Sequence, residues 1–154
     1  LEVIQSVFEL LEMQAVKSSI SLEFDHKYTS AIGVYADRER VQQVLTNLVM
    51  NSIKYGKKKG TTEVSVQSVA DDKIMVRVRD NGEGIEQEHL PRLFERFYRV
   101  DKSGNRRRGG SGLGLAIVKH IIEAHKEQIF VESQAEIGSE FSFTLEKGSL
   151  TDAA

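Results

Sequence analysis

The segment IMVRVRDNGEGI, residues 74–85, limits the possible folds more than any other part of the chain. Ile74, Val76 and Val78 alternate with a methionine and arginines, which predicts a strand with one apolar face against a core. Asp80 continues the apolar series, just before two glycines break the strand. Burying a carboxylate is costly unless a partner binds it. The segment therefore predicts a strand that ends in a functional acid.

The rest of the chain alternates between helical and strand patterns. Helical spacing of apolar residues covers residues 4–15, 37–55 and 112–125. Strand patterns cover residues 20–24, 62–69, 73–80, 128–133 and 140–146. A short turn joins the second and third of these strands as an antiparallel hairpin. This order predicts an α/β two-layer sandwich, in which helices cover one face of a mixed, largely antiparallel sheet.

Length and composition predict one ordinary soluble domain. The chain has 154 residues, of which 40% are hydrophobic and 29% are charged, enough to bury a core without disulfides. The formal net charge of -2 gives no support for nucleic-acid binding through bulk charge. The absence of cysteine excludes thiolate metal sites and suits a cytoplasmic setting. No apolar run reaches the roughly 18 residues of a membrane helix, so we expect no direct membrane contact by this domain.

One face of the second predicted helix carries polar side chains that suit a nucleotide. The stripe consists of Asn47, Asn51, Lys54 and Tyr55. Their helical spacing places them side by side, next to the apolar stripe of the same helix. An amide oxygen is a hard neutral ligand for Mg²⁺, while the lysine suits phosphate and the tyrosine offers an aromatic wall. For each residue alone a solvated helix surface is the simpler interpretation, and only the combination favours a cleft.

A glycine-rich segment, RRRGGSGLGLAIV at residues 106–118, predicts a site for an anion. Glycines let the backbone approach a ligand closely, and the helix that follows directs N–H groups and its positive end toward it. The pattern is neither a Walker A loop nor a G-x-G-x-x-G turn. Residues 99–111 carry five cationic side chains against one acid. This stretch is therefore either a lid that folds over a polyphosphate or a solvated loop.

Five motifs together resemble the boxes of the catalytic, ATP-binding domain of sensor histidine kinases. In chain order, the counterparts of the N, G1, F, G2 and G3 boxes are NLVMNSIKY (47–55), DNGEGI (80–85), LFERFYR (93–99), GSGLGL (110–115) and GSEF (138–141). The resemblance implies a Bergerat fold, as in gyrase, heat-shock chaperone and mismatch-repair ATPases, over residues 1–148, with a tail over 149–154. It also implies ATP and Mg²⁺ as ligands. Residues 126–128 and Glu136 depart from the family, because they stand where it often has glycines.

The resemblance also assigns roles to individual residues. Asp80 would bind the adenine amino group and stay unpaired until adenine arrives, with Ser139 sharing a bridging water. Asn51 would bind magnesium, Lys54 would contact phosphate, and Arg99 would steady the γ-phosphate during transfer. These three form the implied catalytic set. The rest of the implied nucleotide site consists of Asn47, Tyr55, Gly82, Gly84, Ile85, Gly110, Gly112, Leu113, Gly114, Leu115 and Phe141.

Asn47 separates this chain from the ATP-hydrolysing relatives. In the hydrolysing and serine-phosphorylating members a glutamate at this position acts as general base, and an amide cannot accept a proton. We therefore expect the γ-phosphoryl group to pass to a histidine on a separate dimerisation domain, within two-component signal transduction. A response-regulator receiver domain would be the next partner. The four histidines of this chain lack the sequence context of the family's phosphoacceptor.

Two other functions stay open at this point. An anti-sigma-factor serine kinase matches the length of the chain, but it would carry glutamate at position 47. A nucleotide-sensing interaction module would bind ATP and leave a supplied histidine hairpin unphosphorylated. For the kinase interpretation, we expect a domain that is monomeric when isolated. In the cell it would form the cytoplasmic part of a membrane-anchored bacterial sensor.

Overall fold

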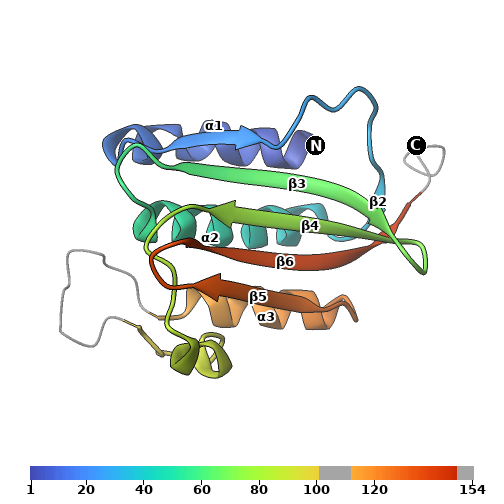
Figure 1. The fold of residues 1–154 in the computed structure, drawn as a ribbon. Coiled ribbons are helices and arrows are strands. Elements are labelled where there is room, and N and C mark those ends of the chain that lie inside the picture. The colour runs from blue at the N-terminus through green and yellow to red at the C-terminus, as the bar shows by residue number, and fades with distance from the viewer. Residues whose placement is uncertain (101–111, 149–154) are drawn as a thin grey trace.

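The computed structural model of the chain describes residues 1–100 and 112–148, which form a layer of helices on a six-stranded sheet (Figure 1). The elements in chain order are α1 (Glu2–Lys17), β1 (Ser21–Phe24), β2 (Val34–Tyr35), α2 (Arg38–Tyr55), β3 (Thr61–Val69), β4 (Lys73–Asp80), the 3-10 helix η1 (Gln87–Arg92), α3 (Gly114–Ala124), β5 (Ile129–Gln134) and β6 (Gly138–Lys147). The predicted two-layer α/β architecture is confirmed. Most of the predicted lid, Gly110 and the tail at 149–154 lie outside the described residues.

The sheet has the strand order β1-β3-β4-β6-β2, and β5 also pairs with β6. β1 runs parallel to β3, whereas the other pairs are antiparallel, so the sheet is mixed and largely antiparallel as predicted. The sequence patterns missed β2, a strand of two exposed residues that pairs with the end of β6. They also missed η1, which contains Pro91 and has no buried residue. Neither element carries a periodic apolar signal.

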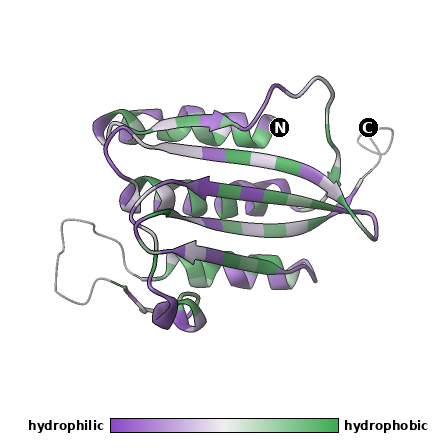
Figure 2. Ribbon diagram, viewed as in Figure 1, coloured by the Kyte–Doolittle hydropathy of each residue, from purple (hydrophilic) through white to green (hydrophobic). Residues whose placement is uncertain are grey.

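The three α-helices lie on the same face of the sheet (Figure 1). Each helix buries an apolar stripe, and these stripes meet the hydrophobic residues that alternate along the strands (Figure 2). The predicted start of α2 is confirmed, because the Asp37 side chain accepts a hydrogen bond from the Arg40 N–H at 3.2 Å. On the opposite face of the sheet, Arg79 forms an ion pair with Glu140 at 2.9 Å. The core therefore lies between the sheet and the helices, and the outer face carries charged side chains.

The two departures from the family's glycines fall in turns that keep a left-handed backbone. Lys126 has φ 60° and Glu136 has φ 68°, a region that glycine adopts more easily. Beside the first of these turns, the Glu127 side chain is only 7% exposed and pairs with Lys73 at 2.7 Å. It also accepts a hydrogen bond from Thr144 at 2.8 Å. Non-glycine residues thus retain both turns, and Glu127 ties the end of α3 to the sheet.

Candidate functional site

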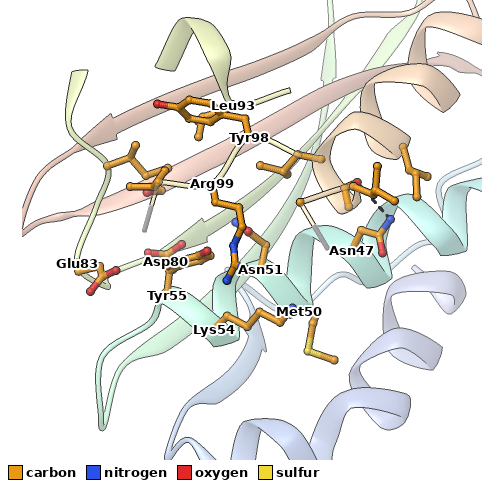
Figure 3. Close-up of a pocket in the computed structure, with 18 of the residues that line it drawn as sticks. Asn47, Met50, Asn51, Lys54, Tyr55, Asp80, Glu83, Leu93, Tyr98 and Arg99 are labelled. Atoms are coloured by element: carbon orange, nitrogen blue, oxygen red, sulfur yellow. Dashed lines mark hydrogen bonds between the residues drawn. The ribbon is translucent and has the colours of Figure 1, made fainter. Parts of the chain in front are cut away.

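A cavity of about 370 Å³ lies between α2, the end of β4 and the start of α3 (Figure 3). Thirteen of the residues assigned from the sequence line it: Asn47, Asn51, Lys54, Tyr55, Asp80, Gly84, Ile85, Arg99, Gly112, Leu113, Gly114, Leu115 and Ser139. Figure 3 shows Asp80 and Tyr55 at one end of the cavity and Asn47 toward the other. Residues from all five motifs, which are far apart in the sequence, therefore share one cavity, and the predicted stripe on α2 forms one of its walls.

Asp80 is buried at the end of β4 and is 8% exposed. The backbone N–H of Gly82 donates to its Oδ1 at 2.9 Å, so the prediction that this carboxylate stays unpaired is wrong. The chain folds back directly after the strand and supplies that donor itself. Burial raises the pKa of Asp80, while the backbone N–H groups of Gly82 and Ser139 and the side chain of Ser52 act in the opposite direction. The carboxylate is thus held by the protein and still lines the cavity.

Two buried hydroxyl groups, one on α2 and one on β3, lie close to Asp80. The Oγ of Ser52 on α2 lies 2.6 Å from the Oγ1 of Thr62 on β3. Thr62 also lies opposite Asp80 in the β3–β4 register. Either hydroxyl can be the donor in this pair, and the Ser52 hydroxyl also lowers the pKa of the Asp80 carboxyl. The orientation of Asp80 therefore depends on three elements: β4, α2 and β3.

The glycine turn after Asp80 is fixed against the turn between β5 and β6. Gly84 has φ 71°, and a Cβ added there would lie 2.1 Å from the carbonyl oxygen of Gln134. The N–H of Glu136 donates to the Glu83 carbonyl at 2.6 Å. Gly82 does not line the cavity; a Cβ on it would lie 2.3 Å from the Tyr55 carbonyl oxygen. Both glycines are therefore needed for close packing of the backbone around the acid.

Gly84→Ala is expected to lower the free energy of unfolding by more than about 1 kcal/mol, because alanine meets both a left-handed φ and a backbone clash there. Urea denaturation followed by circular dichroism measures the change. Gly114→Ala is the matched control, since an added Cβ at that position has nothing within 4 Å. Equal stability of the two variants would contradict the close packing described for this turn.

The start of α3 forms the opposite wall of the cavity. The helix begins at Gly114, and Leu113 at its N-cap makes no side-chain hydrogen bond to the first turn. Gly112 packs on the backbone of Phe97, whose N–H donates to the Gly112 carbonyl at 2.8 Å. Across the cavity, the Asn47 side-chain N–H donates to the Gly114 carbonyl at 3.4 Å. The positive end of α3 is therefore positioned at the cavity, where it favours an anion.

Comparison with known proteins places this geometry in a family. The family model of histidine kinase-, DNA gyrase B- and HSP90-like ATPases matches residues 36–149. The chain belongs to this family. The sensor histidine kinase YkoH of Bacillus subtilis (strain 168) is 43% identical over 126 residues, which are 79% of this chain and 26% of YkoH. The chain thus corresponds to about a quarter of that relative's length.

Solved structures of histidine kinases share the fold. The catalytic domain of ThkA has a TM-score of 0.76 and 32% identity, over 95% of this chain and 91% of that one. Full-length ShkA in complex with AMPPNP has a TM-score of 0.83 and 25% identity, over 96% of this chain and 30% of ShkA. A structure of ThkA in complex with the response regulator TrrA has a TM-score of 0.76 and 30% identity, over 96% of this chain and 40% of the ThkA chain. The implied Bergerat fold is confirmed.

The aromatic residues of the F-box segment have different surroundings. Phe94 packs edge-on against Phe141 with ring centroids 6.2 Å apart. Phe141 is 2% exposed and lies behind the cavity rather than in its lining. Tyr98 does line the cavity, and its hydroxyl bonds to His89. Phe97, in contrast, has φ 66° and is 69% exposed.

Further lining residues carry no role in the assignment from the sequence. They are Met50, Glu83, Leu93, Tyr98, Val100 and Ile117. Met50 lies three residues after Asn47 on the same helix, so helical spacing contained the signal for it. Glu83 and Tyr98 lie inside the G1 and F motifs themselves. Ser133, in contrast, lies outside every motif, although it bonds to the turn that follows Asp80.

The donor atoms of the cavity fit magnesium only in company with phosphate. Among residues 1–100 and 112–148, there is no cluster of three or more His, Cys, Asp or Glu side chains that could hold a metal ion. Asn51 and Glu83, which carry side-chain oxygens, line the cavity. Mg²⁺ commonly takes one or two protein oxygens and completes its shell with waters and substrate phosphates. Asn51 therefore suits a metal that arrives with a nucleotide.

Helix lengths and hydropathies bear on membrane association. In the part of the chain that the structure describes, none of the helices combines the length and the apolar character needed to cross a bilayer.

Proposed function

We propose that this chain binds Mg-ATP in the cavity and transfers the γ-phosphoryl group to a histidine on a separate dimerisation domain. The observation that carries the proposal is the division of one cavity into two ends. A buried acid, Asp80, lies at one end, the start of α3 lies at the other, and the cationic Lys54 and Arg99 line the same cavity. An adenine with an amino group suits the first end, and a polyphosphate suits the second.

Four groups of this chain would hold the nucleotide's phosphates. Figure 3 shows Arg99 reaching across the cavity toward Asn51 and Lys54. The two cationic side chains and the N–H groups at the start of α3 would neutralise phosphate charge, and Asn51 would supply the protein oxygen for magnesium. Bound Mg²⁺ supplies positive charge at the phosphate oxygens during transfer. Binding energy is thus directed at the part of ATP that reacts.

The transfer itself needs positioning more than acid–base catalysis. A neutral imidazole nitrogen of the partner would attack the γ-phosphorus, and the bond to the oxygen bridging the β- and γ-phosphorus atoms would break. ADP would leave with that electron pair. Since the neutral imidazole is already a nucleophile, no general base is required. This agrees with Asn47, whose amide donates to the Gly114 carbonyl instead of accepting a proton.

The proposal also includes the partners and setting of the domain. Residues 1–148 would form the catalytic half of a sensor kinase, and the dimerisation domain of the same protein would provide the histidine. A response-regulator receiver domain would then accept the phosphoryl group; this is supported by the solved complex of ThkA with TrrA. The domain would act on the cytoplasmic side of a membrane-anchored bacterial sensor.

Phosphotransfer to the dimerisation hairpin of the parent protein, expressed separately, tests the proposal. With this chain, γ-labelled ATP and Mg²⁺, the hairpin is expected to gain label that is lost in acid and stable in base, as a phosphohistidine is. A hairpin with its phosphoacceptor histidine replaced by alanine is the control. Tight ATP binding with an unlabelled hairpin would instead indicate a nucleotide-sensing module. Label on a serine-bearing antagonist protein would indicate a serine kinase.

A further inference from the structure

At the end of the cavity that contains Asp80, β6 lies between β4 and β5 and pairs with both. Ser139 on β6 lies opposite Asp80 of β4 and opposite Ser133 of β5. Ser139 lines the cavity, whereas Ser133 does not. The hydroxyl oxygens of the two serines are 2.8 Å apart, a distance at which one donates to the other. The direction of that hydrogen bond decides what Ser139 can offer to a ligand.

The other partners of Ser133 fix this direction. A hydroxyl group has one hydrogen to donate and two lone pairs to accept with. The Ser133 hydroxyl donates to the carbonyl oxygen of Gly138 at 3.0 Å, and a carbonyl can only accept. It accepts from the backbone N–H of Ile85 at 2.8 Å. One lone pair remains, so all three hydrogen bonds form together only with Ser139 as the donor in the serine pair. The hydroxyl hydrogen of Ser139 therefore points away from the cavity.

This end of the cavity consequently presents acceptors. The carboxylate of Asp80 accepts hydrogen bonds. Within the protein it accepts one from the Gly82 N–H. The hydroxyl oxygen of Ser139 has used its hydrogen on Ser133 and can only accept. An acceptor pair suits an amino group or a bridging water and disfavours a carbonyl oxygen, which would lack a donor.

We propose that Ser133 determines base specificity from outside the cavity, by holding the Ser139 hydroxyl as an acceptor. The inference rests on the proposed ATP binding and adds a positioning residue to it. Ser133 would act through Ser139 on the group at carbon 6 of a purine. With Ser133 in place, the amino group of a 6-amino purine finds acceptors, whereas the oxygen of a 6-oxo purine finds no donor. Without it, the Ser139 hydroxyl can rotate and donate to a 6-oxo group.

The ratio of inosine triphosphate to ATP dissociation constants tests this role. The two nucleotides differ at carbon 6 and the adjacent nitrogen, and a fluorescent ATP analogue competed with each of them gives both constants. Ser133→Ala is expected to lower this ratio about 5- to 10-fold, which is the effect of losing one hydrogen bond. Ser133→Thr keeps a hydroxyl and is expected to retain the wild-type ratio. Ser142→Ala, at a buried serine of β6 outside the cavity lining, is the matched control.

Ser139→Ala provides a second route to the same conclusion, including the case in which Ser133→Ala does not fold. Removing the oriented hydroxyl is expected to narrow the ratio as well, and Ser133→Ala should then add nothing in that background. If Ser133→Ala weakens both nucleotides by the same factor, Ser133 is only structural and the inference is wrong. A ratio of dissociation constants below the wild-type value in Ser133→Thr would also overturn the inference. If the wild type binds neither nucleotide, the proposed function fails and the inference fails with it.

Discussion

Asp80→Asn is expected to weaken ATP binding about 10- to 100-fold, which is the usual effect of losing a hydrogen bond to a charged group. The asparagine oxygen can still accept from the Gly82 N–H. Its amino group would then face the cavity, where it would oppose the amino group of adenine with a second donor. Titration with a fluorescent ATP analogue, followed by competition with ATP, measures the change. Asp71→Asn is the control, because Asp71 is exposed in the β3–β4 turn and has a left-handed φ that asparagine tolerates.

The same substitution is expected to make the nucleotide-free protein more stable at neutral pH. Burial raises the pKa of Asp80 in the folded state, so the folded protein binds this proton more tightly than the unfolded chain does. The resulting stabilisation is present below the unfolded pKa and is lost as the pH rises through the raised pKa. Asp80→Asn should therefore melt above the wild type at pH 7, with a smaller difference near pH 4. If Asp80→Asn instead melts below the wild type at pH 7, the ionised carboxylate stabilises the fold, and the expected destabilisation by a buried charge is wrong.

Asn51→Ala is expected to remove the dependence of ATP binding on magnesium and to slow phosphotransfer by about 10- to 100-fold. Asn51 lines the cavity beside Lys54 and Arg99, so its loss would remove a protein oxygen where phosphate charge must be neutralised. Titrations in Mg²⁺ and in EDTA give the dependence directly. Gln43→Ala, two turns earlier on α2 and outside this cavity, is the control. An Asn51→Ala protein whose affinity still rises with Mg²⁺ as in the wild type would disprove the assignment.

Sequence patterns were sufficient for elements whose local signals all agree. β4 combines strict alternation with a turn at each end, and α2 combines a capping aspartate, an apolar stripe and a polar stripe. The cavity wall on α2 followed from the same periodicity. β2 was missed because two exposed residues carry no period. The parallel pairing of β1 with β3 is likewise a property of the assembled sheet and not of either strand alone.

The hydrogen bonds around Asp80 could not be predicted from the sequence, for a different reason. One of its donors is the backbone N–H of Gly82, and every residue except proline carries such a group. The pattern therefore identified a buried acid and not its partner. Ser133 is 48 positions from Ile85 along the chain, and a lone serine on a strand has no distinctive spacing. Only the packing of the β5–β6 turn against the glycine turn brings the two together.

The face of the sheet opposite the helices has a practical consequence for measurements on this protein. The cavity lies on the helix side, whereas Gln67 of β3 is exposed and hydrogen-bonds to Arg77 on the outer face. Since the chain has no cysteine, Gln67→Cys would introduce its sole thiol. Maleimide chemistry at that thiol would anchor every molecule to a sensor chip in one orientation. The proposed nucleotide site, on the other side of the sheet, would then face the flowing solution.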